Sequence, residues 1–149
     1  MYISMNWIND YVDLSGMDTE EIVKRFNLST AEIEGYEVKG EKIQNVVFGK
    51  ILEVNDHPES THLHVLKVDV GDEVLQIVCG APNVRVGLRG VLAPVGCKLP
   101  GMKKPMSQRT VAGVESFGMM CSAAELGLSG DDKNIIELNP EYKIGEEYK

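Results

Sequence analysis

The stretch "VVFGKILEVNDHPESTHLHVLKVDVG", residues 46–71, decides the fold of this chain. It contains two runs rich in Val, Ile and Leu, joined by a polar segment, residues 55–61, whose Asn, Asp, Pro and Ser are turn formers. Two further runs of the same kind follow, at residues 74–80 and 90–96. Short apolar runs separated by turn residues are typical of strands in a small barrel. The sequence therefore predicts a mainly β domain that begins near residue 45.

The second run, residues 62–70, has apolar side chains on both of its faces. Successive side chains of a strand point in opposite directions, so Val65 faces one way while Leu66, Val68 and Val70 face the other. A strand that is apolar on both faces is usually covered on both. We therefore expect this strand to be central and strongly curved.

All three histidines of the chain lie in this stretch, at His57, His62 and His64. His62 and His64 are two residues apart and share a face, so a zinc site is geometrically conceivable. A structural zinc ion needs four ligands, and only two imidazoles are close together. His57 precedes a proline in the polar turn. We therefore expect no metal site, and we interpret the histidines as parts of a strand and its turn.

The composition describes an ordinary globular chain of 149 residues, with 43% apolar and 26% charged residues. This length suits one core with a small appendage. No apolar run is long enough to span a bilayer, and the first residues lack the pattern of a secretory signal, so a cytoplasmic location is expected. Cys79, Cys97 and Cys121 are odd in number and widely spaced, which favours buried free thiols over disulfides.

The first forty residues predict a small α+β segment. Residues 17–29 have apolar side chains at helical spacing, with Asp18 or Thr19 as the N-cap. The segment before this helix is predicted to be a short strand that runs into a helical turn, with Trp7 packing the two together. Residues 31–40 alternate and close on a glycine, as a short strand would.

The last third of the chain predicts short elements. Gly113 and Gly118 bracket a strand-like piece. Ser122 is placed to cap a short helix over the following five residues, and Glu125 stands at the capping-box position. Residues 134–139 are predicted to form a small strand.

The charge of the chain is unevenly distributed. The net charge is −8, which at first argues against a polyanion as partner. Residues 1–41 carry three basic and nine acidic side chains, residues 42–115 carry nine and seven, and residues 116–149 carry three and seven. No Asp or Glu occurs between Glu73 and Glu115. The cations of this acid-free interval are Arg85, Arg89, Lys98, Lys103, Lys104 and Arg109. The positive charge of this interval could attract a phosphate backbone or an acidic surface of a partner, or it could pair with the acidic segments of the chain itself. Charge alone leaves these alternatives open.

Five motifs in order resemble one known family. They are "MYISMNWINDYVDL" (1–14), the stretch at 46–71, "QIVCGAPNV" (76–84), "LPG" (99–101) and "GVESFGMMCSAAELGL" (113–128). Together they resemble the N-terminal part of the bacterial phenylalanyl-tRNA synthetase β chain, over essentially the whole sequence. Each motif alone is modest, but five in the right order and spacing are highly specific.

The resemblance implies two parts. Residues 1–40 would be a small N-terminal α+β segment of a discontinuous domain, which in the family packs against a domain from much later in the β chain. Without that partner we expect this segment to expose an apolar surface. Residues 41–149 would be a tRNA-binding domain of the OB-fold type.

The resemblance also implies a function. The family enzyme is an α2β2 heterotetramer that joins phenylalanine to its tRNA using ATP and Mg²⁺. Its catalytic site lies on the α chain and its editing site further along β, so this fragment is expected to be non-catalytic, without cofactors of its own. We expect an auxiliary backbone and shape contact to tRNA, with no DNA or membrane partner. The alternatives are a protein–protein assembly module of the synthetase, or a free-standing tRNA-binding protein, which the N-terminal motif disfavours.

The candidate contacts are drawn from the acid-free interval and the last motif. The interval contains no aromatic residue, so contact with the phosphate backbone is expected in place of base stacking. For Ser116 and Ser122 the alternative to tRNA contact is a structural role, at a strand end and as a helix cap. For the cations the alternative is simple solvation. Met119, Met120 and Cys121 are expected in the core. The predicted tRNA-binding residues are Asn83, Arg85, Lys98, Lys103, Lys104, Arg109, Ser116 and Ser122.

Overall fold

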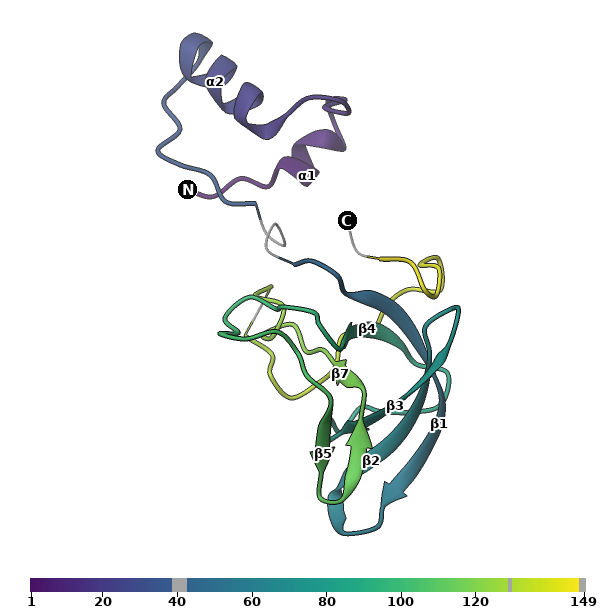
Figure 1. Cartoon of the computed structure of the whole chain (residues 1–149). Helices are drawn as coiled ribbons and strands as arrows, with labels where there is room; N and C mark the ends of the chain where they lie inside the picture. Colours follow the sequence, from purple (N-terminus) through teal and green to yellow (C-terminus); the bar gives the residue numbers. More distant parts are fainter. Residues whose placement is uncertain (39–42, 129, 148–149) are drawn as a thin grey trace. The chain divides into compact units, whose positions relative to one another are not determined.

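The computed structural model describes residues 1–38, 43–128 and 130–147 (Figure 1). The chain divides into two compact units, Met1–Glu37 and Val38–Lys149, each of which is treated separately below. The predicted boundary between residues 40 and 41 lies outside the described residues. No helix in the described part of the chain is long and apolar enough to cross a membrane.

The first unit is helical. It contains α1 (Met5–Asn9) and α2 (Thr19–Ser29). The Asp18 carboxylate accepts a hydrogen bond from the Glu20 backbone N–H at 3.1 Å and caps α2, as predicted. The strands expected before α1 and over residues 31–38 are not formed, and residues 39 and 40 lie outside the described part. The prediction of an α+β segment is therefore wrong in its β part, because neither stretch finds a strand to pair with.

The first unit has no interior of its own. None of residues 1–37 is buried, and Trp7, expected to pack the segment together, is 74% exposed. That packing role is therefore wrong, whereas the expected apolar surface is confirmed. Its large exposed side chains are Met1, Tyr2, Ile3, Trp7, Tyr11, Val12, Met17, Phe26, Leu28 and Tyr36.

The second unit is built on a five-stranded antiparallel sheet with the order β3-β2-β1-β4-β7. Its strands are β1 (Val47–His57), β2 (Ser60–Asp69), β3 (Val74–Cys79), β4 (Arg89–Pro94) and β7 (Gly118–Met120). A separate hairpin consists of β5 (Arg109–Val111) and β6 (Val114–Ser116). The four strands predicted from the apolar runs are confirmed.

The sheet closes on itself between β3 and β7, which contact each other. The Phe117 backbone N–H donates to the Gln76 carbonyl at 2.9 Å, and the Val78 N–H donates to the Ser116 hydroxyl at 3.0 Å. The closed order is therefore β1-β2-β3-β7-β4. A small, partly open five-stranded antiparallel barrel is the OB architecture, so the predicted fold class is confirmed.

Curvature enters the sheet through its longest strand, β1. A register shift between Ile51 and Glu53 leaves Leu52 exposed while Ile51 is fully buried. The neighbouring β2 lies between β1 and β3 and buries Leu66 and Val68 completely. The central position predicted for this strand is confirmed.

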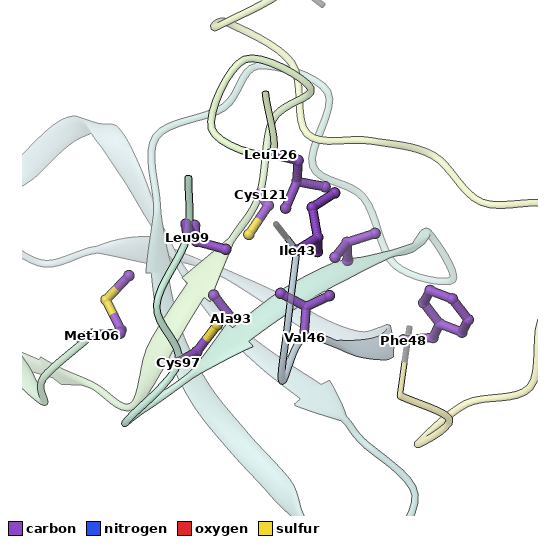
Figure 2. Packing of buried hydrophobic residues seen from close by; sticks show 10 residues of the cluster. Ile43, Val46, Phe48, Ala93, Cys97, Leu99, Met106, Cys121 and Leu126 are labelled. Atoms are coloured by element: carbon purple, nitrogen blue, oxygen red, sulfur yellow. The ribbon is translucent and has the colours of Figure 1, made fainter. Parts of the chain in front are cut away.

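Two apolar clusters fill the barrel. One includes Ile51, Leu66, Val68, Ile77 and Leu92, all without solvent exposure. The other, shown in Figure 2, includes Val46, Ala93, Cys97, Leu99, Met106 and Cys121. All three cysteines are buried and free, as predicted. Burial raises the pKa of the Cys121 thiol to about 12.

The segment after β7 departs from prediction. Residues 123–128 form hydrogen-bonded turns, not a helix. The predicted capping box is nevertheless present, since the Ser122 N–H donates to the Glu125 carboxylate at 2.7 Å and the Glu125 N–H donates to the Ser122 hydroxyl at 3.3 Å. One helical turn fixes several residues for a single hydrogen bond, so a cap alone does not make a helix. The strand expected at 134–139 is reduced to an isolated bridge between Ile135 and Ser122.

The C-terminal residues bind back to the barrel. The Arg89 guanidinium donates to the carbonyls of Pro140 and Tyr142, at 2.7 and 3.1 Å. The Tyr142 ring packs edge-on against Phe48, with centroids 5.2 Å apart. The Phe48 N–H then donates to the Glu146 carbonyl at 3.0 Å. The C-terminal segment thus pairs with the start of β1.

Candidate nucleic-acid interface

The loop between β4 and β5, residues 95–108, carries three of the predicted cations on a fixed base. Cys97 and Met106 are buried in the apolar cluster of Figure 2. The Met106 N–H donates to the Cys97 carbonyl at 2.6 Å, and the Gly96 N–H donates to the Met106 carbonyl at 2.7 Å. Both ends of the loop are thus held to each other and to the core.

The tip of this loop is a tight turn. The Met102 N–H donates to the Leu99 carbonyl at 3.1 Å, and Gly101 has a positive φ of 84°. Proline followed by glycine at these positions is the type II turn sequence, since the third residue must adopt a positive φ. Leu99 is buried and anchors the turn. Lys98 therefore lies before the turn and the remaining two lysines follow it.

Four of the predicted contact residues are exposed cations in this loop or directly after it: Lys98, Lys103, Lys104 and Arg109. Lys98, Lys103 and Lys104 belong to the loop, and Arg109 begins β5. None of the four forms an ion pair or a side-chain hydrogen bond with any residue in the described ranges. We call the segment that carries them, residues 98–109, the cationic loop.

Glu115, the acid at the end of the acid-free interval, binds a neutral residue of the loop and forms no ion pair within the described residues. Glu115 lies on β6, opposite Thr110 of β5. The Gln108 amide donates to its carboxylate at 2.9 Å. Arg109 lies opposite Ser116, not opposite Glu115, so its charge stays without a carboxylate partner.

Two of the six cations of the interval are engaged within the protein. Arg85 forms a two-pronged ion pair with Glu137, at 2.9 and 2.6 Å. Hydrogen bonds from Arg85 and then from Asn83 lower the pKa of Glu137 to about 2. Arg89 donates to backbone carbonyls, as described above. For Arg85 the alternative left open by the sequence therefore holds, since its partner is an acid of the chain itself, 52 residues later.

Asn83, predicted to face sugar or base, uses its amide inside the protein. Its oxygen accepts from the Ile135 N–H at 3.0 Å and its nitrogen donates to the Ile135 carbonyl at 2.9 Å. These two hydrogen bonds join the loop after β3 to the C-terminal segment. The geometry is that of a strand pair made by a side chain.

Both predicted serines are buried and hydrogen-bonded. The Ser116 hydroxyl accepts from the Val78 N–H and donates to the Gly118 carbonyl at 3.0 Å, where the barrel closes. The Ser122 hydroxyl takes part in the capping box with Glu125. The strand-end role weighed for Ser116 is confirmed, whereas Ser122 keeps its capping hydrogen bonds without a helix to cap. Contact with RNA by Asn83, Arg85 and the serines remains a prediction, and their polar groups already have partners.

A shallow pocket of about 460 Å³ lies beside the ends of β3 and β7. Met119, predicted to lie in the core, is half-buried and lines this pocket, whereas Met120 and Cys121 are buried as predicted. Its rim carries Glu125, Asp132, Lys133 and Asn134. These residues include two acids and one cation, so the pocket offers no positive field for a phosphate.

The histidines do not form a metal centre. Within the described ranges, no group of three or more His, Cys, Asp or Glu side chains is placed to hold a metal ion. His64 faces Asp56 across the β1–β2 pair, with 3.6 Å between Nδ1 and the carboxylate. His57, which lies in the polar turn identified from the sequence, is buried. Sequence reasoning missed this residue because its partner lies far along the chain.

The model of a family described as a putative tRNA-binding domain matches residues 46–147, which includes the whole barrel and the cationic loop. The chain belongs to this family of tRNA-binding domains. The match leaves out the helical first unit, in agreement with the division of the chain at Glu37.

Among the relatives of this chain are phenylalanine–tRNA ligase β subunits. The chain is 41% identical to that of Sulfurimonas denitrificans over 155 residues, which covers 99% of this chain and 19% of the relative. It is 44% identical to that of Bacillus subtilis over 129 residues, which covers 86% of this chain and 16% of the relative. The chain therefore spans less than a fifth of the length of these relatives.

Two solved structures share the fold of the tRNA-binding domain. A MetRS-related protein from Pyrococcus horikoshii superposes with a TM-score of 0.53 at 22% identity, over 78% of this chain and 100% of that one. The C-terminal domain of Plasmodium vivax p43 has a TM-score of 0.51 at 18% identity, over 74% of this chain and 62% of that one. At these identities the likeness concerns the fold alone.

Proposed function

We propose that this chain is the tRNA-contacting part of a phenylalanine–tRNA ligase β subunit, and that it binds the tRNA backbone through the cationic loop. One observation carries the proposal: within a matched tRNA-binding domain, Lys98, Lys103, Lys104 and Arg109 are exposed cations without a carboxylate partner in the described residues. Phosphate oxygens are the natural partners of such a group.

The contact is expected to read shape and charge, not sequence. Bases are recognised by stacking on aromatic rings, and residues 74–114 contain none. The loop base is held by buried Cys97 and Met106, so the cations are presented by a fixed frame. Such a surface supports an auxiliary contact to tRNA(Phe) during its aminoacylation.

The chemistry of the full ligase would lie elsewhere. The relatives are named as ligases, yet this chain spans less than a fifth of them, and its described residues contain no cluster suited to a metal. We propose that ATP and Mg²⁺ are used by other parts of an α2β2 assembly in the cytoplasm. This chain would supply binding energy to the tRNA and no catalytic group.

A second candidate function is assembly of the synthetase. The observation that favours it is the first unit, in which no residue from 1 to 37 is buried and ten large apolar side chains are exposed. Such a surface is typical of a protein contact. A free-standing tRNA-binding protein is less well supported, because the β-subunit relatives match 99% of this chain, first unit included.

Charge reversal distinguishes the two functions. Lys103→Glu with Lys104→Glu places two carboxylates at the loop tip without touching the core. Under the tRNA proposal, tRNA affinity falls while assembly with the α subunit, measured by analytical ultracentrifugation, stays intact. If the chain serves assembly through its first unit, both tRNA affinity and assembly should be unchanged in this variant, and loss of assembly alone would place a partner protein on the loop.

A further inference from the structure

His57 ends β1 and is only 4% exposed, although it lies in a polar stretch of sequence. Its ring accepts a hydrogen bond at Nδ1 from the Glu59 backbone N–H, at 3.1 Å. An Nδ1 that accepts carries no proton, so the neutral ring holds its proton on Nε2. That Nε2–H donates to the Val111 carbonyl at 3.0 Å. One buried ring thus ties the β1–β2 turn to a strand 54 residues away.

Val111 is the last residue of β5, the strand that begins with Arg109. The hairpin of β5 and β6 is a sheet of its own, separate from the main sheet. Its β6 side is tied to β3, since the Gln76 amide donates to the Glu115 carbonyl at 2.9 Å. Within the described residues, β5 pairs only with β6.

β5 is therefore held to the rest of the barrel at its two ends. Before it, Met106 is buried and hydrogen-bonded to the loop base. After it, the Val111 carbonyl accepts from His57. Figure 1 shows the tip of the hairpin at the same end of the barrel as the β1–β2 turn.

The hairpin needs this outer tether. Each of its strands has three residues, and a two-stranded hairpin is marginal by itself. Its two turn residues, Ala112 and Gly113, both have positive φ, of 46° and 85°. Glycine adopts this conformation freely, but alanine does so at a cost. The turn therefore contributes little to closing the hairpin.

We propose that His57 is a positioning residue for RNA binding: through Val111 it fixes β5, and thereby holds Arg109 in place to meet a phosphate. This inference rests on the proposed function of the cationic loop. Without the tether, β5 is held only through the buried Met106 and its pairing with β6, so the three-residue strand, and Arg109 with it, samples more conformations. Ordering it on the RNA then costs conformational entropy, and one phosphate contact is weakened.

Two substitutions separate the halves of this tether. His57→Gln places an amide N–H near the position of Nε2 and retains a donor toward the Val111 carbonyl. His57→Asn retains an acceptor for the Glu59 N–H but is too short to reach Val111. His62→Asn makes the same chemical change at an exposed neighbour and serves as the control, because the His62 ring has no hydrogen-bond partner in the described part of the chain.

The experiment is a double-mutant cycle between His57→Asn and Arg109→Gln in the 149-residue chain, with tRNA(Phe) transcript as probe. Loss of one phosphate contact lowers affinity about sixfold at 0.1 M salt and reduces the salt slope by about one. We expect this loss for Arg109→Gln and a similar loss for His57→Asn. In the Arg109→Gln background, His57→Asn should cause no further loss. His57→Gln and His62→Asn should bind as the unmodified chain does.

Amide hydrogen exchange over residues 109–116 gives a second readout. His57→Asn should speed exchange there while β1 to β4 remain protected. An equal loss of affinity in both backgrounds would mean that His57 supports the fold in general, and would overturn the inference. So would unchanged affinity in His57→Asn where Arg109→Gln weakens binding. If Arg109→Gln itself has no effect, Arg109 is not a contact, and the failure lies with the proposed function.

Discussion

Neutralising the tip of the cationic loop should weaken tRNA binding in a manner that depends on salt. The double variant Lys103→Gln, Lys104→Gln removes two charges that have no partner to lose among the described residues. Both side chains are exposed on a loop whose buried anchors, Cys97 and Met106, are unchanged. The fold should therefore be unaffected, and any change in affinity reports the RNA contact.

The size of the effect follows from counterion release. Each neutralised phosphate contributes about 0.7 to 0.9 to the slope of log K against log salt, so four cations predict a slope near −3. Between about 50 and 200 mM salt, the affinity of the unmodified chain should fall about a hundredfold. With two cations removed, the same change in salt should lower affinity only about tenfold.

The assay is fluorescence anisotropy of labelled tRNA(Phe) transcript titrated with the 149-residue chain along a salt series. The matched control is Lys24→Gln with Lys143→Gln, which lowers the net charge equally at two exposed lysines outside the loop. We expect the loop variant to bind about 40-fold more weakly at 0.1 M salt than the unmodified chain. The control should change affinity far less.

Two results would refute this reasoning. If both double variants lost affinity equally, net charge would govern binding and the loop would not be a contact. If the loop variant retained a slope near −3, the phosphates would be neutralised by other cations. Circular dichroism of both variants checks that the barrel remains folded.

Three further predictions concern the barrel itself. Arg85→Gln removes the main cause of the lowered pKa of Glu137, about 2 in the folded chain, so this pKa should rise toward the usual value for glutamate; carboxyl NMR titration measures it. The stabilisation that the pair provides is complete above the usual pKa and is lost as pH falls toward 2, so the variant should lack this acid dependence. Gly118 has a φ of 147°, and Gly118→Ala places a methyl 2.6 Å from a backbone oxygen of β4. This substitution should lower the free energy of unfolding, measured by urea titration, by about 3 kcal/mol. The control is Gly130→Ala, whose methyl meets no atom within 4 Å. Because burial raises its pKa to about 12, the Cys121 thiol should resist iodoacetamide at pH 8 until urea unfolds the chain, as mass spectrometry would show; rapid alkylation of the native chain would contradict its burial.

The strands of the barrel were predictable from the sequence because their signal is local. Runs such as residues 46–54 and 63–71 combine β-branched residues with flanking turn formers, and both become strands. The same reasoning failed for residues 31–38, which alternate but find no neighbouring strand. A strand is stabilised by its pairing partner, and the local pattern does not contain that partner.

The contact residues were only partly predictable for a related reason. A side chain's type indicates what it can bind, but not which group in the folded chain has already bound it. Arg85 and Lys103 look equivalent in sequence, yet Glu137 takes the first and leaves the second free. His57 was not a predicted contact, because its hydrogen bond is to a carbonyl 54 residues away that the local sequence does not reveal.

The acidity of the chain and its proposed affinity for RNA are compatible because charges act over short distances in salt. At physiological ionic strength, interactions between exposed charges fade beyond about 8 Å. The four cations of the cationic loop have no carboxylate partner in the described residues, and the neighbouring Glu115 is bound by the neutral Gln108. The net charge of −8 acts at longer range and opposes the approach of tRNA. Contact is therefore favoured and approach is slowed, which suits a surface that meets its RNA after other parts of an assembly have brought it near.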